Sequence, residues 1–251
     1  MASQTTAKTH TMRALVELRK RIIDGDIPGG TRLFEVALAE DLQISRTPVR
    51  EAMSRLAEEG LLERARSGGF LVRSFAYADV IDTIELRGVL EGTAARLAAE
   101  RGVPEAKLKE IGAIVQKLDL CIGETPDDVD FAAYSELNSD FHEALAALPG
   151  SATLERELDR AKRLPFASPS AFLPDNTQLS KFRRSLHAAQ DQHREIVTAI
   201  HRREGARAEA LAREHAQAAR RNLEYIFSKD RSLLSSVPGL ALVSSDGPDG
   251  A

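Results

Sequence analysis

Hydrophobic positions recur every three or four residues along most of the chain, and one stretch near residue 65 breaks this rhythm. Leu15, Leu18 and Ile22 share one face of a predicted helix, "FEVALAEDL" predicts a short second helix, and "RTPVREAMSRLAEEG" predicts a third. The segments "LLERA" and "FLVRSF" then predict two short strands around the glycine turn "RSGG". Three helices followed by a hairpin predict a winged helix-turn-helix over residues 12–75.

After residue 75 the strand signals end and helical periodicity continues, which predicts an all-α helical bundle over residues 76–229. The predicted helices cover residues 79–101, 104–121, 127–148, 151–164, 180–203 and 204–228. The polar residues 1–11 are expected to form a disordered arm, and residues 230–251 a disordered tail. The expected fold class is therefore mainly α, with an N-terminal winged helix-turn-helix and a C-terminal helical bundle.

Composition narrows the class of protein. The 251 residues favour two domains, and 43% hydrophobic with 29% charged residues fits a soluble protein. Apolar runs are too short to cross a bilayer, and no signal-peptide pattern opens the chain. Cys121 is the single cysteine, which excludes an internal disulfide and favours the cytoplasm. Residues 1–75 carry a net charge of +2 and the remainder −6, which permits nucleic-acid contact by the first part.

The start of the third helix holds polar groups suited to DNA. Pro48 fits a first helical turn, Ser45 or Thr47 can cap it, and Arg46, Thr47 and Arg50 lie at its N-terminal end. A helix in the major groove presents this end to base edges, and an arginine reads guanine through two hydrogen bonds. The alternative is a solvated surface helix whose arginines pair with nearby glutamates. The agreement of turn, proline, apolar stripe and glycine hairpin favours DNA contact.

The stretch "PGGTRLFEVALAEDLQISRTPVREAMSRLAEEGLLERARSGGFLV" resembles the DNA-binding domain of the GntR family of bacterial transcription regulators, over roughly residues 12–73. The resemblance implies that polar side chains at the start of the third helix contact operator DNA and that the glycine wing enters the minor groove. Some relatives carry a further arginine on the preceding helix, where this chain has "FEVALAE". The residues expected at DNA are Ser45, Arg46, Thr47, Arg50, Arg55, Arg66, Gly68 and Gly69.

Three predicted helices of the bundle carry a histidine in phase with apolar residues. "YSELNSDFHEAL" places Asn138 and His142 one turn apart, and "HREIVTAI" and "LAREHAQAA" place His193 and His215 on apolar faces. A buried imidazole needs a partner, because leaving it unpaired costs on the order of 1–3 kcal/mol. These residues are therefore expected either to share a metal ion or to be hydrogen-bonded separately in the core.

The helical part resembles the FCD ligand-binding domain of the FadR-type subgroup, through "NSDFH", "HREI" and "REHAQAA". The resemblance implies a divalent transition metal, Zn or Ni, held by Asn138, His142, His193 and His215. Asn138 stands where relatives often have an aspartate, so the ligand set lacks that negative charge. Many FCD relatives sense small organic acids.

Arg87, in "TIELRGVLEG", shares a helix face with Ile84 and Ala94. It is expected either to bind the carboxylate of an effector or to form an i,i+4 ion pair with Glu91. The FCD resemblance favours the effector.

These features predict a homodimeric cytoplasmic transcription regulator and not an enzyme or a membrane protein. It binds a palindromic operator, and a small organic acid bound near the metal controls it. Analogy with the family favours a repressor, although the sequence itself does not distinguish a repressor from an activator. One alternative is a regulator that senses the metal alone. Another is a metallohydrolase, against which the chain shows no general-base carboxylate beside the histidines and no G-x-S-x-G motif.

Overall fold

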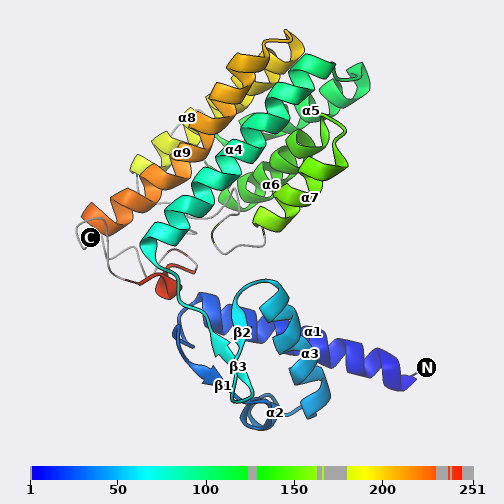
Figure 1. The fold of residues 1–251 in the computed structure, drawn as a ribbon, viewed down its shortest axis with the longest axis vertical. Coiled ribbons are helices and arrows are strands. Elements are labelled where there is room, and N and C mark those ends of the chain that lie inside the picture. The colour runs from blue at the N-terminus through cyan, green and yellow to red at the C-terminus, as the bar shows by residue number, and fades with distance from the viewer. Residues whose placement is uncertain are drawn as a thin grey trace. The chain divides into compact units, whose positions relative to one another are not determined.

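A computed structural model of the chain describes residues 2–123, 129–162, 166, 180–229, 237 and 239–244. The described residues form two compact units, called here the winged-helix unit and the helical unit. The winged-helix unit comprises the residues up to Asp79 together with residues 239–244, and the helical unit comprises Val80–Lys162 and the helices of residues 180–229 (Figure 1). Within the described ranges, no helix is long and apolar enough to span a membrane.

The winged-helix unit packs helices against a small antiparallel sheet. Its helices are α1 (Ala2–Ile23), α2 (Glu35–Leu42) and α3 (Arg46–Glu58), and its strands are β1 (Arg32–Leu33), β2 (Leu62–Arg64) and β3 (Phe70–Val72). The strand order is β1–β3–β2, with Leu33 opposite Phe70 and Glu63 opposite Leu71. Residues at helical spacing form the buried core, namely Leu15, Leu18, Ile22, Val49, Met53 and Leu56. The predicted winged helix-turn-helix is confirmed.

The hairpin between β2 and β3 turns on two glycines in the left-handed backbone region, Gly68 at φ 89° and Gly69 at φ 77°. A Cβ atom on Gly69 would lie 2.7 Å from the carbonyl oxygen of Leu33, so a glycine also allows β1 to approach the wing. The sequence did not predict β1, because a two-residue strand leaves no alternating pattern.

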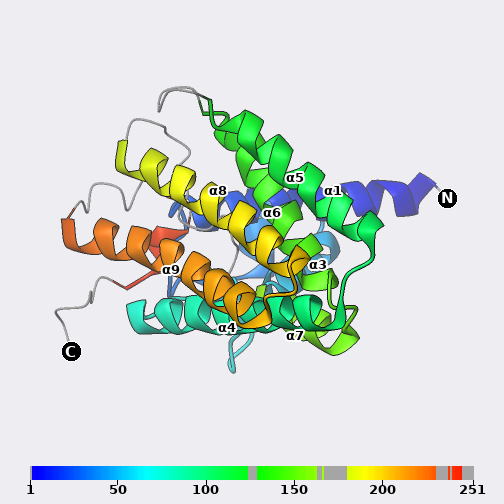
Figure 2. The same ribbon diagram turned by 90° about the horizontal axis from the view of Figure 1, so that it is seen from above.

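The helical unit consists of α4 (Tyr77–Arg101), α5 (Glu105–Cys121), α6 (Phe131–Ala147), α7 (Ala152–Lys162), α8 (Ser180–His201) and α9 (Gly205–Lys229). Figure 2 shows α8 and α9 side by side, with α4 next to α9 and α5 next to α8. A Cβ on Gly88 would lie 2.9 Å from Cβ of Ala216, so a glycine allows α4 and α9 to pack closely. The predicted all-α bundle is confirmed.

The N-terminal arm differs from the expectation of disorder, because α1 begins at Ala2. No glycine or proline lies between Ala2 and Ile23, so nothing interrupts the helix. Thr11 is buried, and its hydroxyl lies 3.1 Å from the Glu51 carboxylate of α3. This contact joins the first half of α1 to the neighbouring helix.

Residues 239–244, named here the C-terminal segment, are ordered within the winged-helix unit. The Gly239 amide donates a hydrogen bond to the Ile23 carbonyl at 3.0 Å. The Phe75 amide donates to Leu242 at 2.9 Å, and the Ser244 amide donates to Phe75 at 2.8 Å. These bonds attach the segment both to the end of α1 and to the residue that follows the wing.

The prediction of a disordered tail is therefore wrong for residues 239–244. Polar, Gly- and Pro-containing neighbours mask the apolar run "GLALV", from which the short helix η2 (Leu240–Leu242) is built. Leu240, Leu242 and Val243 are buried. The remainder of the expected tail, apart from Val237, lies outside the described residues.

We expect Leu240→Ser to destabilise the winged-helix unit by about 2–4 kcal/mol, because the side chain is 1% exposed and its loss leaves a cavity with a hydroxyl inside. Urea denaturation followed by circular dichroism, with amide hydrogen exchange of α1, measures the loss. The same substitution at Leu120, which is 85% exposed, is the control and should change stability by less than about 0.5 kcal/mol. Equal effects of both substitutions would show that the C-terminal segment is not part of the core.

Candidate functional site

The N-terminal end of α3 presents Arg46, Thr47 and Arg50, all of them exposed. Ser45 occupies the N-cap position, but its side chain makes no capping hydrogen bond. Pro48 stands at the third position of α3 and has no N–H group, which removes one of the two donors that a capping side chain uses. The Ser45 hydroxyl thus does not cap the helix, and the polar side chains at this end of α3 are all exposed to solvent.

Glu35, the first residue of α2, holds the two arginines of α3. Its carboxylate accepts two hydrogen bonds from Arg50, from Nε and Nη2, both at 2.7 Å. Nη2 of Arg46 lies 3.6 Å from the same carboxylate. The hydrogen bond from Arg50 lowers the pKa of Glu35. The partner of Arg46 and Arg50 thus comes from the preceding helix, α2.

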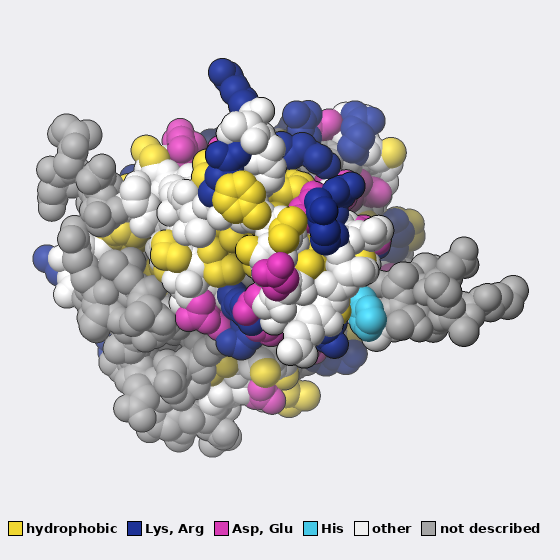
Figure 3. Space-filling view, turned by 90° about the horizontal axis from the view of Figure 1, so that it is seen from below, with side chains coloured by type: hydrophobic (Ala, Val, Ile, Leu, Met, Phe, Trp, Pro, Cys, Tyr) yellow, Lys and Arg dark blue, Asp and Glu magenta, His cyan; other side chains and the backbone are white. Residues whose placement is uncertain are grey.

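The other residues predicted to contact DNA divide between α3 and the wing. Nη2 of Arg55 lies 2.6 Å from the carboxylate of Glu51, one turn earlier on α3. Arg66 is exposed beside the wing turn, and the Gly68 carbonyl accepts a hydrogen bond from Arg32 at 2.6 Å. Figure 3 shows Lys and Arg side chains around exposed hydrophobic side chains on the face that carries α2. The stretch "FEVALAE", in which some relatives carry a further arginine, holds no arginine, and its Val36 is exposed.

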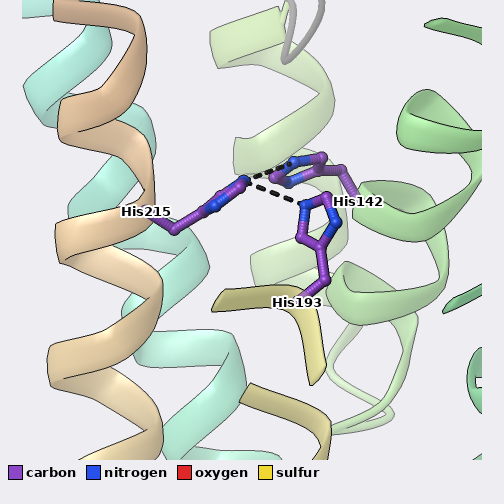
Figure 4. Close-up of side chains that lie close together, drawn as sticks. All are labelled: His142, His193 and His215. Carbon is purple, nitrogen blue, oxygen red and sulfur yellow. Dashed lines mark hydrogen bonds between the residues drawn. The ribbon is translucent and has the colours of Figure 1, made fainter. Parts of the chain in front are cut away.

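The helical unit brings three histidines together in its core. His142 of α6, His193 of α8 and His215 of α9 are all buried. Nε2 of His215 lies 3.1 Å from Nε2 of His193 and 3.3 Å from Nε2 of His142 (Figure 4). One nitrogen of each ring lies within 4.8 Å of the others. The histidines singled out by their helical spacing thus meet at one point of the fold.

Each imidazole directs its other nitrogen, Nδ1, at a side-chain oxygen. The pairs are His142 with Glu91 at 2.9 Å, His193 with Gln190 at 2.9 Å, and His215 with Gln192 at 3.2 Å. Carboxylate and amide oxygens accept hydrogen bonds, so each Nδ1 carries the proton and each Nε2 keeps a lone pair. Three lone pairs that point at one another repel, and a cation between them removes the repulsion. Metal-binding histidines are oriented in this way.

The geometry and charge state of the cluster fit a divalent metal. Metal–nitrogen bonds of about 2.0–2.1 Å in a tetrahedral site place two ligand nitrogens about 3.3–3.4 Å apart, close to the separations of 3.1 and 3.3 Å seen here. Burial lowers the pKa of His193 well below its usual value and that of His215 to about 3. Both rings are therefore neutral at pH 7, the form that binds a metal.

Glu91 of α4 adds a buried negative charge next to the cluster. Burial alone would raise its pKa, but the contacts with His142 and Arg87 outweigh burial and lower the pKa to about 2. Oε2 of Glu91 lies 3.9 Å from Nε of Arg87, so the expected i,i+4 pair is present. Both side chains are buried, unlike the exposed pairs for which such contacts are weak. The pair therefore belongs to the interior of the site.

Asn138 and Arg87 meet at a small cavity beside His215. The cavity measures about 30 Å³ and is also lined by Tyr134 and Asn222. This volume holds about two water molecules. Asn138 is buried one turn before His142 on α6, as its spacing predicted. The proposed fourth ligand and the proposed effector contact thus face one enclosed polar space.

Sequence reasoning missed the residues that orient the others. The sequence marks Glu91 only as an i,i+4 partner for Arg87, and no spacing connects Glu35, in the preceding helix, with the arginines of α3. Gln190 lies one turn before His193 on the same apolar face, which is the one signal that could have marked it. A glutamine at such a position is more often solvated, so the signal is weak without the fold.

Two family profiles account for this architecture. The profile described as "Bacterial regulatory proteins, gntR family" matches residues 12–72, and the profile described as "FCD domain" matches residues 82–218, more than half of the chain. The chain belongs to the GntR family, with an FCD domain. As a member of that family it is a DNA-binding transcription regulator, and its winged-helix unit is the DNA-binding part.

Relatives of this GntR-family regulator are themselves described as transcription regulators. It is 30% identical over 148 residues to the "Uncharacterized HTH-type transcriptional regulator YdhC" of Bacillus subtilis (strain 168), which covers 59% of this chain and 64% of that protein. It is 28% identical over 246 residues to an "Uncharacterized HTH-type transcriptional regulator in unstable DNA locus" of Streptomyces ambofaciens, covering 93% of both. The solved structure "E. coli McbR/YncC" aligns with a TM-score of 0.60 at 20% identity, over 87% of this chain and 99% of the other, which supports the fold.

We expect His193→Ala to lower the affinity for added Zn²⁺ or Ni²⁺ by at least roughly 100-fold. Loss of a residue that only hydrogen-bonds to a metal ligand already costs about 10- to 100-fold in metal affinity, and this substitution removes a ligand itself. Elemental analysis of the purified protein and competition with a chromogenic chelator measure the change. His201→Ala is the matched control, since His201 is exposed at the end of the same helix. Full metal occupancy in His193→Ala would exclude His193 from the site.

Proposed function

We propose that this regulator reads its operator through Arg46, Thr47 and Arg50. The observation that carries the proposal is the outward-facing end of α3 with its arginines held by Glu35. Arg50 uses Nε and one N–H of Nη2 for Glu35, which leaves the edge formed by Nη1 and Nη2 for the O6 and N7 atoms of a guanine. We assign additional backbone and minor-groove contacts to Ser45, Arg55, Arg66, Gly68 and Gly69.

We further propose that the cluster binds Zn or Ni through His142, His193 and His215, with the amide oxygen of Asn138 as an additional ligand. Imidazole suits both metals. This ligand set is uncharged, and the nearest negative charge is Glu91, which acts through His142. When bound, the metal would supply a positive charge next to the cavity.

The effector of this proposal is a small carboxylic acid bound beside the metal and Arg87. Arg87 and His215 line the same cavity, and the guanidinium, together with a metal held by His215, would favour a carboxylate there. Because the cavity has room for about two water molecules, the acid must be small and must widen the cavity as it binds. The effector then shifts the population between DNA-binding and non-binding forms and relieves repression.

The proposed assembly is a homodimer formed through the helical unit. Leu86 and Val89 on α4 are 45% and 38% exposed, although Ile84, Ala94 and Ala98 of the same helix are buried in the bundle. Exposed apolar side chains on one helix favour a protein partner. Two winged-helix units would then bind half-sites about one helical turn apart on a palindromic operator.

A second candidate is a regulator that responds to the metal alone. The small volume of the cavity favours it, because a metal fits between the histidines without any movement of the lining side chains. In that case DNA affinity changes with added Zn²⁺ or Ni²⁺ in the absence of any organic acid. The effector proposal instead requires a carboxylate in addition to the metal.

Affinity selection of the purified protein against a random duplex library tests the function. A short palindromic motif whose affinity falls steeply with salt is the expected outcome. Repeating the selection with Zn²⁺, with a chelator and with a panel of small carboxylates separates the two candidates. No enrichment in any of these conditions would contradict the proposed operator binding.

Arg50→Ala should lower specific operator affinity by about 1–3 kcal/mol, because it removes a two-hydrogen-bond contact to a base. Fluorescence anisotropy with the selected duplex measures the loss, and sedimentation confirms an unchanged assembly. Arg19→Ala serves as the control, since Arg19 is paired with Glu59, the C-cap residue at the opposite end of α3 from Arg50. Unchanged operator affinity in Arg50→Ala would remove the base-reading role.

Arg87→Met should weaken binding of the active carboxylate by roughly 10- to 100-fold, since hydrogen bonds to charged groups contribute about 1.5–3 kcal/mol. Calorimetric titration of the metal-loaded protein measures the change. Arg96→Met, in the same helix, is the control because Arg96 pairs with Glu100 and Glu209 and does not line the cavity. If Arg87→Met binds the acid as tightly as the unaltered protein does, the carboxylate contact lies elsewhere.

A further inference from the structure

Gln190 of α8 is the buried partner of the ligand histidine His193. Its side chain is 2% exposed and belongs to the core of the helical unit. The amide oxygen lies 2.9 Å from Nδ1 of His193. A buried amide of this kind needs partners for all of its polar atoms, so its orientation is informative.

The orientation of the Gln190 amide follows from its neighbours on α5. Its nitrogen donates to the main-chain carbonyl of Val115 at 3.0 Å and to the carboxylate of Asp119. Both neighbours only accept hydrogen bonds, so the NH₂ group must face α5. The oxygen must then face His193, and an oxygen there requires the proton on Nδ1. Two acceptors on another helix thus determine which nitrogen of the imidazole is protonated.

Asp119 is itself held in place. Arg194, the residue after His193, donates from Nη2 to Oδ1 of Asp119 at 2.7 Å and from Nε to Oδ2 at 3.4 Å. A chain of contacts therefore runs from the half-exposed Asp119–Arg194 ion pair through Gln190 to the buried imidazole of His193. Its members come from α5 and α8, so it also joins these two helices.

We propose that Gln190 is a positioning residue for the metal site: it keeps His193 in the tautomer whose Nε2 lone pair faces the other two histidines. This inference rests on the metal site of the proposed function. Without an acceptor at Nδ1, the proton of a neutral imidazole can move to Nε2, where Nε2 of His215, 3.1 Å away, accepts it. A metal must then displace that proton and re-orient the ring before it binds.

Gln190→Leu tests the proposal, because leucine fills much of the same volume and offers no acceptor. The first readout is the tautomer of His193 in the metal-free protein, from long-range ¹H–¹⁵N spectra of histidine-labelled samples. The second readout is the affinity for Zn²⁺, from competition with a chromogenic chelator. We expect a shift toward the Nε2–H tautomer and a 10- to 100-fold loss of affinity.

Gln190→Glu separates positioning from a packing role. The glutamate still accepts from Nδ1 of His193, so tautomer and Zn²⁺ affinity should stay close to those of the unaltered protein. Combination with Asp119→Asn restores a donor opposite the new carboxylate and removes the repulsion between two acids. Gln217→Leu is the matched control, since Gln217 is a half-buried glutamine of α9 whose amide donates to Glu85 of α4.

The outcomes are distinct. Unchanged affinity in Gln190→Leu overturns the proposal, and so does a loss that neither glutamate variant restores, because that result indicates packing alone. If the unaltered protein binds neither Zn²⁺ nor Ni²⁺, the metal site of the proposed function fails, and with it any positioning of a ligand. A tautomer shift together with the affinity loss, both reversed in the glutamate variants, supports the role.

Discussion

The helical unit is organised around the requirement that three buried imidazoles find partners. Burying a polar group without a hydrogen bond costs several times what one hydrogen bond contributes, so such a cluster is stable only if every nitrogen is satisfied. Here the outer nitrogens are satisfied by Glu91, Gln190 and Gln192, and the inner nitrogens converge. Because the histidines come from α6, α8 and α9 and the carboxylate from α4, this one requirement fixes four helices relative to each other. A cation at the centre would complete the set and add its binding energy to folding.

At the N-terminal end of α3, a carboxylate also holds other side chains in place, but here the side chains are exposed to solvent. Glu35 holds Arg50 and Arg46 from a neighbouring helix, much as Glu91 of α4 holds His142 of α6. The arginines are 60% and 61% exposed, so their pairing contributes little to stability. In the proposed operator contact, the pairing would restrict two long side chains before DNA binds, which reduces the entropy lost on binding. The buried pairs around the histidines thus fix the packing of helices, whereas the exposed Glu35–arginine pairs limit the conformations of side chains that are proposed to bind DNA.

How far the sequence predicts these features depends on whether a feature is periodic. The long helices and the inward placement of His142, His193 and His215 follow from 3.6-residue spacing, because burial selects every third or fourth residue. β1 is too short to have a period. Glu35 and Glu91 act on residues of other helices, and spacing within one helix carries no information about such partners. Gln190 does share a helix face with His193, but the contacts that orient its amide lie on α5, where the spacing along α8 gives no sign of them. The ordered segment at residues 239–244 was hidden by its composition, although its leucines are as buried as any in the core.

The C-terminal segment, residues 239–244, changes how the chain divides into the winged-helix unit and the helical unit. The winged-helix unit draws on both ends of the chain, with α1 and Phe75 contacting residues near Leu240. The FCD part is therefore inserted in sequence between pieces of the DNA-binding part and does not simply follow it. By sequence, the winged-helix unit runs to Asp79, in the first turn of α4, and continues again after α9, the helix that carries His215. A truncation that removes residues 239–244 would therefore also remove Leu240 and Leu242, which are buried in the winged-helix unit.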